Sequence, residues 1–139
     1  MRKLLYSLLI VLTTLTYGKQ GEEMKISIES NGNTTIFELN DSQASKDLYA
    51  QLPLTIAVEN FGNNEKIFYP PTKLSVNNTP KANAKNGTLA YYAPWADVVM
   101  FYKDFGSASD LYGLGECISG LEHINKMTGT IKINKQQYF

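Results

Sequence analysis

The chain has 139 residues, with thirteen basic and thirteen acidic side chains, one His and one Cys. Charged residues make up 19% of the chain and the two signs are mixed, so no basic surface is evident that could neutralise several phosphates, which argues against a nucleic-acid partner. A single Cys excludes an intramolecular disulfide framework, and this length predicts one domain with its own core.

The amino terminus has the pattern of an export signal. Arg2 and Lys3 precede an apolar run over residues 4–15, and small residues follow at the usual cleavage distance. As a helix this run would rise about 18 Å, against roughly 30 Å for a hydrocarbon core, so cleavage is favoured over anchoring. We therefore predict a signal peptide over residues 1–18 and an exported protein, periplasmic or extracellular, without a stable membrane span. An uncleaved interfacial anchor is the alternative.

The first elements of the remaining chain are predicted to be a β-hairpin and a short helix. Polar and apolar residues alternate over residues 25–39 on both sides of Asn31 and Gly32, a pair that tolerates the positive φ angles of a type I′ turn. Residues 40–42 then offer N-cap side chains, and apolar residues recur at every fourth position until Pro53. This spacing predicts an amphipathic helix of about ten residues.

The middle of the chain alternates between strand and loop patterns. A second hairpin is expected over residues 54–69, with its turn at residues 62–64. Residues 72–87 are rich in Asn, Lys, Pro and Thr and predict a long exposed loop, which in a compact domain tends to be functional or mobile. Strands are predicted at residues 88–92 and 98–102, and the second is expected to be central because it is apolar on both faces.

The last part of the chain predicts two strands with a helical turn between them. The strand pattern around Cys117 favours a buried and inert thiol. Ser119 and Glu122 have the spacing of a capping box and predict a helical turn at residues 121–126. Alternation over residues 130–133 then indicates a final strand.

Together these patterns predict one mainly β domain over residues 19–139, with about eight short strands and two short helices. A closed barrel would hide the strand edges better than an open sheet. Five segments between residues 24 and 133 carry a further signal, namely Leu52-Pro53-Leu54-Thr55, Tyr69-Pro70-Pro71, Gly87 to Trp95, Phe101 to Gly106, and Leu114 to Gly120. With this order of elements, the chain resembles the small bacterial cyclophilin-like domain family, as an exported member. The resemblance implies a closed eight-stranded barrel capped by two helices, and a fold does not by itself carry a function.

Prolyl isomerisation is the activity that this resemblance would suggest, and the composition argues against it. Cyclophilins use an Arg that donates hydrogen bonds to the twisting amide, whose barrier is about 20 kcal/mol. The only Arg, Arg2, lies in the predicted signal, and Lys does not offer the same planar fork. We therefore expect a non-catalytic module that binds a peptide or a small ligand. The alternative is an enzyme, either a degenerate isomerase or an unrecognised hydrolase.

Other chemical sites have weaker signals. Four potential metal ligands lie near the carboxyl end, namely Glu116, Cys117, Glu122 and His123. Their spacing matches no familiar site, so neither a metal nor a cofactor is predicted. Three acidic residues could serve acid/base catalysis, namely Asp97, Asp104 and Asp110. Asp is common in turns for backbone reasons, which explains at least two of them equally well.

Aromatic side chains are dense between residues 91 and 105. Strand alternation sends about half of them into the core, and the others could line a groove, since rings with polar tips suit a surface that is both apolar and wet. Trp95 lies in a turn between two predicted strands, where a large indole is harder to bury. We predict that four residues contribute to a ligand site, namely Tyr69, Tyr92, Trp95 and Tyr102. Nothing in the sequence indicates an oligomeric state.

Overall fold

The computed structural model describes residues 23–136, so the predicted signal over residues 1–18 lies outside the described residues. Within the described part, nine strands and two helices follow one another along the chain. They are β1 (Lys25–Ser30), β2 (Asn33–Leu39), α1 (Gln43–Ala50), β3 (Leu54–Ala57), β4 (Glu59–Phe61), β5 (Glu65–Phe68), β6 (Thr88–Tyr92), β7 (Asp97–Phe101), β8 (Leu111–Ser119), the 3-10 helix η2 (Leu121–Lys126) and β9 (Thr130–Lys135). Between residues 23 and 136, no helix has both the length and the apolar character needed to cross a membrane.

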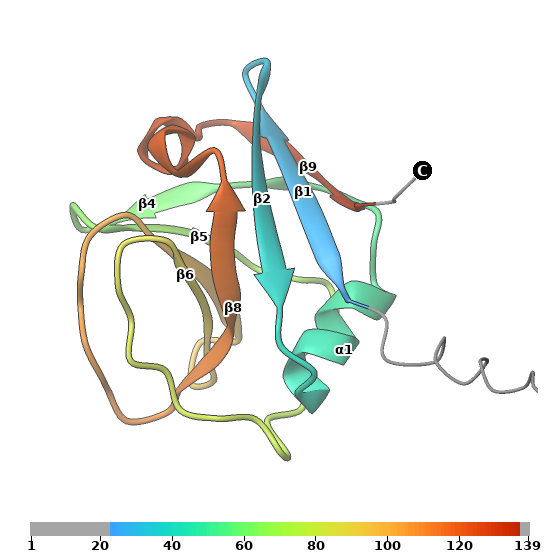
Figure 1. Ribbon diagram of the computed structural model, residues 1–139, viewed down its shortest axis with the longest axis vertical. Coiled ribbons are helices and arrows are strands. Elements are labelled where there is room, and N and C mark those ends of the chain that lie inside the picture. Colours follow the sequence, from blue (N-terminus) through green and yellow to red (C-terminus); the bar gives the residue numbers. More distant parts are fainter. Residues whose placement is uncertain (1–22, 137–139) are drawn as a thin grey trace, which may run out of the picture.

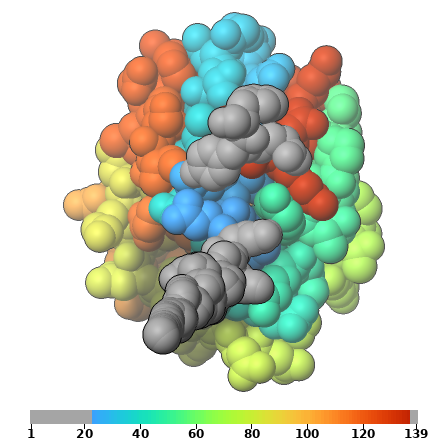
Figure 2. All heavy atoms as spheres, turned by 45° about the vertical axis from the view of Figure 1, so that its right-hand side comes forward, coloured from blue at the N-terminus to red at the C-terminus, as the bar shows by residue number. Residues whose placement is uncertain are grey.

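The strands form a single sheet that curves into a nearly closed barrel (Figure 1). Over the described residues the strand order is β3-β9-β1-β2-β8-β6-β7-β5-β4, and every neighbouring pair is antiparallel. Figure 2 shows one part of this order from the side, where β8, β2, β1 and β9 lie next to one another across the surface. The predicted mainly β barrel is therefore confirmed, and it is nearly closed.

The strand count differs from the predicted eight because one expected strand is divided. The two outer strands of the sheet, β3 and β4, are separated along the chain only by Val58. The Val58 N–H donates to the carbonyl oxygen of Gly129 at 2.9 Å, and its side chain is buried in the core. The chain thus turns at Val58 from one edge of the sheet to the other, which brings the two edges together.

The turn and cap chemistry of the first half of the chain is confirmed. Asn31 and Gly32 have φ angles of 51° and 82°, as the hairpin turn requires. Ser42 is the N-cap of α1, and its side chain accepts from the backbone N–H of Ser45 at 3.2 Å. In Figure 1, α1 lies at one end of the barrel and η2 at the opposite end.

The capping box predicted for η2 is wrong. Its N-cap is Gly120, with φ of 79° and no side-chain hydrogen bond, while Ser119 remains in β8. A Cβ at Gly120 would collide with the carbonyl oxygen of Thr34, so β2 and this turn approach each other more closely than other residues allow. The close approach and the positive φ therefore explain why Gly, rather than a residue with a capping side chain, precedes the helix.

Apolar side chains form two clusters on opposite faces of the sheet. The larger one fills the barrel, and the smaller one lies on the outer face of β5, β6 and β7. Ala82 and Ala84 of the predicted exposed loop belong to the smaller cluster, and Ala84 forms a β-bridge with Gly106. The loop over residues 72–87 is therefore partly buried, because its small residues pack on the sheet and pair with the segment after β7.

Candidate functional site

A cavity of about 280 Å³ opens on the outer face of β5, β6 and β7. Alternation along β7 directs Asp97, Val99 and Phe101 towards it. The strand register places Glu65 of β5 opposite Phe101, and Tyr92 of β6 opposite Asp97. Three neighbouring strands thus present their side chains to the same space.

Aromatic rings form much of the wall of this space, which we call the aromatic cavity and which Phe61, Tyr92, Trp95, Phe101 and Phe105 line together with Glu65 and Asp97. The Trp95 ring meets Phe61 edge to face at 5.3 Å between centroids and Tyr92 at 5.7 Å. Phe105 stacks on Phe101 at 5.2 Å. Phe61, Trp95 and Phe105 are 44%, 50% and 46% exposed, so a large aromatic surface faces solvent.

Backbone geometry in the turn between β6 and β7 explains why Trp95 is on the surface. The Trp95 N–H donates to the carbonyl oxygen of Tyr92 at 3.3 Å, and Ala96 follows with φ of 57°. This tight turn leaves no strand position for the indole. The ring therefore stays half exposed, lines the cavity and is held by its edge-to-face contacts.

Two carboxyl groups lie among these rings. Asp97 is 2% exposed, and its Oδ1 atom has no hydrogen-bond partner within the described residues. Burial raises the pKa of Asp97 to about 6, against a smaller opposing effect of its own backbone N–H. Burial also raises the pKa of Glu65, and the charge of Asp97 raises it further. The lining of the cavity thus combines apolar side chains with two acidic groups.

The structure brings together two of the four predicted site residues. Tyr92 and Trp95 line the aromatic cavity. Tyr69 follows β5 next to Asp97 and is 45% exposed; burial raises its pKa, and the charge of Asp97 raises it further. Tyr102 lines a separate cavity of about 670 Å³ with Leu121. The separation arises because consecutive residues of a strand point to opposite faces.

Sequence reasoning missed Phe61 and Glu65. They pair with each other across the β4–β5 hairpin, which brings both residues to the cavity. The signal was the turn at residues 62–64, since a hairpin with that turn places these two residues opposite one another.

The three candidate acidic residues have different surroundings. Asp97 lines the aromatic cavity. Asp104 accepts from the backbone N–H of Asn86 at 2.9 Å and so joins two loops. Asp110 has φ of 64°, which is a turn conformation. Asp110 is therefore a turn residue and Asp104 bonds to the backbone of another loop, whereas Asp97 is the one that lines the cavity.

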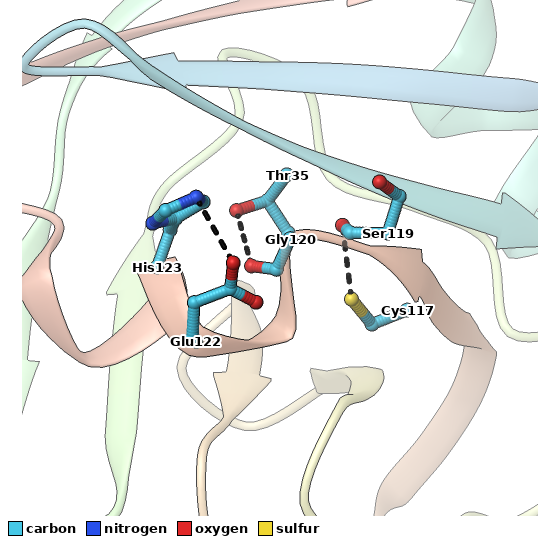
Figure 3. A network of polar contacts seen from close by, with 6 residues as sticks. All are labelled: Thr35, Cys117, Ser119, Gly120, Glu122 and His123. Atoms are coloured by element: carbon cyan, nitrogen blue, oxygen red, sulfur yellow. Dashed lines mark hydrogen bonds and ion pairs between the residues drawn. The ribbon is translucent and has the colours of Figure 1, made fainter.

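The Cys117 thiol makes no pair with His123 (Figure 3). Its Sγ donates to the carbonyl oxygen of Ser119 at 3.3 Å, whereas the Nε2 atom of His123 lies 3.4 Å from Oε2 of Glu122. Cys117 is half-buried rather than fully buried as predicted, and burial raises its pKa, which opposes thiolate formation. Within residues 23–136, no three His, Cys, Asp or Glu side chains gather in a way that could hold a metal ion.

Comparison with known proteins identifies a family and similar solved structures. A family model described as the cyclophilin-like family matches residues 28–135. The solution structure of the hypothetical protein AF2241 from Archaeoglobus fulgidus superimposes with a TM-score of 0.65 at 16% identity, and the match covers 86% of this chain and 99% of that one. At this identity the similarity shows the fold alone. No curated protein matches the sequence.

Proposed function

The chain belongs to the cyclophilin-like family, and we propose that it is a binding module that holds an extended peptide or a small ligand in the aromatic cavity without transforming it. The observation that carries this proposal is the exposure of three large rings around one space: Phe61, Trp95 and Phe105 are each close to half exposed. Fully burying such a side chain contributes about 1.5 to 3 kcal/mol, so a ligand that covers the exposed halves gains affinity from each ring.

The arrangement of the rings also favours binding. Edge-to-face contacts hold Trp95 against Phe61 and Tyr92, and stacking holds Phe105 against Phe101. Rings that are already fixed lose little conformational freedom when a ligand arrives, and such preorganisation preserves affinity. The second cavity, which contains Tyr102, has Lys103 and Glu122 in its wall and no comparable group of rings among the residues that line it.

The charges of the aromatic cavity argue against isomerase chemistry. Among the described residues that line it, the charged ones are Glu65 and Asp97, which are both acidic. Amide rotation is accelerated by a donor aimed at the developing charge, and a carboxylate is an acceptor. We therefore expect proline isomerisation in the presence of this domain to keep the uncatalysed time of tens to hundreds of seconds.

A hydrolase is the second candidate, and one observation favours it. Asp97, with its pKa raised to about 6, lies near a second carboxyl group, Glu65, so one could hold a proton while the other is ionised. Activity against nitrophenyl esters or glycosides that disappears in both Asp97→Asn and Glu65→Gln would support this candidate over a binding module.

The test of binding uses Trp95, which is the only Trp in the chain. Its emission is followed while extended tetrapeptides, with and without Pro, are added to the domain. Tyr92→Ala is expected to weaken binding at least tenfold. Tyr102→Ala, in the other cavity, is the control and is expected to bind with unchanged affinity. Circular dichroism confirms that each variant is folded. Loss of binding only in Tyr102→Ala would place the site elsewhere and overturn the proposal.

Export is a further part of the proposal. It is supported by the sequence pattern of Arg2, Lys3 and the apolar run over residues 4–15. Intact-mass measurement on protein recovered outside the cytoplasm is expected to show a chain that begins at Lys19. A recovered chain that still contains residues 1–18 would contradict this.

A further inference from the structure

Asp97 lines the aromatic cavity and has an unsatisfied side-chain oxygen. Its side chain is 2% exposed, and Oδ1 has no hydrogen-bond partner within the described residues. Buried polar atoms are nearly always paired, and an unpaired buried carboxylate is among the most costly groups in a protein. Such an exception in the lining of an open cavity points to a partner supplied by a ligand.

The charged neighbours of Asp97 do not provide that partner. Glu65, from the adjoining strand, also lines the cavity and is also acidic. Lys66, the residue after Glu65, pairs with Met100, which belongs to the barrel interior, so Lys66 faces away. Tyr69 lies beside Asp97, and its pKa is raised by burial and by the Asp97 charge, so its hydroxyl keeps its proton. The local charge is therefore negative.

We propose that the aromatic cavity selects an alkylammonium group, whose N–H donors pair with Asp97 Oδ1 while its aliphatic stem packs against the rings of Trp95, Tyr92 and Phe61. The inference rests on the proposed binding function and names the class of ligand. An ammonium offers three donors and a charge opposite to that of Asp97 and Glu65. Aromatic faces also attract such cations, most strongly in a partly desolvated site.

The size of the cavity fits a ligand group of this kind. At about 280 Å³ it lies just below the roughly 300 to 1,000 Å³ typical of sites for drug-sized molecules. This is suited to one side chain or one short amine rather than a large cofactor. The ammonium could belong to a Lys in an extended peptide or to a free amine, and both present the same chemistry to the cavity.

The test compares matched charged and neutral probes at constant ionic strength. Trp95 emission is titrated with n-butylammonium chloride and with 1-butanol, and then with the peptides acetyl-Gly-Lys-Gly-amide and its Nε-acetyl-lysine counterpart. We expect each cation to bind at least tenfold more tightly than its neutral partner. If the Lys peptide binds more tightly than butylammonium, the source is a peptide side chain, whereas the reverse order identifies a free amine.

Variants separate this inference from the binding proposal on which it rests. Asp97→Asn is expected to reduce the preference for the cation over butanol by at least tenfold, and Glu65→Gln to reduce this preference less. Asp104→Asn is the control, because this exposed acid lies beside Phe105 but bonds to Asn86. Equal binding of charged and neutral probes would overturn the cation preference alone. No response to any probe or peptide would overturn the binding function itself.

Discussion

Replacing Asp97 by Asn is expected to stabilise the unliganded domain at neutral pH. Burial raises the pKa of Asp97 from 3.8 to about 6. Below the lower value the carboxyl is protonated in both folded and unfolded chains. Between the two values the folded chain keeps a proton that the unfolded chain has released, so the free energy of unfolding falls as pH rises through this window. Above about pH 6 the free energy of unfolding has fallen by the full amount.

The size of the effect follows from the shift. One pKa unit corresponds to about 1.36 kcal/mol, so a shift of roughly two units costs the fold on the order of 2 to 3 kcal/mol at pH 7 and above. Asn has nearly the same shape, carries no charge and keeps an oxygen that can accept from the backbone N–H of residue 97. The Asn variant should therefore recover most of this cost.

Urea denaturation followed by circular dichroism measures this difference in the free energy of unfolding. Wild type, Asp97→Asn and the control Asp104→Asn are compared at pH 7.5 and at pH 4. We expect Asp97→Asn to exceed wild type by about 2 to 3 kcal/mol at pH 7.5 and by much less at pH 4, with the control near wild type at both. Equal stabilities of wild type and Asp97→Asn at pH 7.5, or a difference that does not change with pH, would refute the reasoning.

Three further predictions concern the packing and burial of single residues. Trp95→Ala is expected to lower the free energy of unfolding by only about 1 to 2 kcal/mol, mainly because two ring contacts are lost. A loss of about 3 to 5 kcal/mol in urea denaturation would show instead that Trp95 is a core residue. Gly115→Ala should lower the free energy of unfolding by about 1 to 3 kcal/mol and lower Tm, because its Cβ would collide with the Glu38 backbone. An unchanged Tm would contradict this. Cys117 should react with a thiol reagent more slowly than free cysteine at pH 7.5, because burial raises its pKa.

Local patterns were sufficient to predict most of the fold. Alternation and turn residues identified the hairpin at Asn31 and Gly32, and Ser42 predicted the start of α1. The division at Val58 was not predictable in this way, because nothing in its immediate neighbours marks the point at which the barrel closes. Its conformation depends on contact with Gly129, which is distant in sequence.

The candidate site was partly predictable for a related reason. Trp95 is predicted because an indole is harder to bury in a turn, and Tyr92 because it lies in the same aromatic segment; both arguments are local. Tyr102 was grouped with them because it is close in sequence, although the strand directs it to the opposite face from Phe101. Glu65 was missed because its role appears only when β5 pairs with β7 and places it at the cavity.

The residue at position 97 is a second sign, beside the exposed rings, that the aromatic cavity has a use. β7 is otherwise Val-Val-Met-Phe, every residue of it is buried, and its neighbours in the cavity wall are mostly apolar. An apolar side chain of similar volume would avoid the desolvation of a carboxylate and would agree with the local pattern. Residues that oppose both local preference and stability tend to be retained where they contact a ligand. A cation that pairs with Asp97 would remove the cost that the unliganded fold carries.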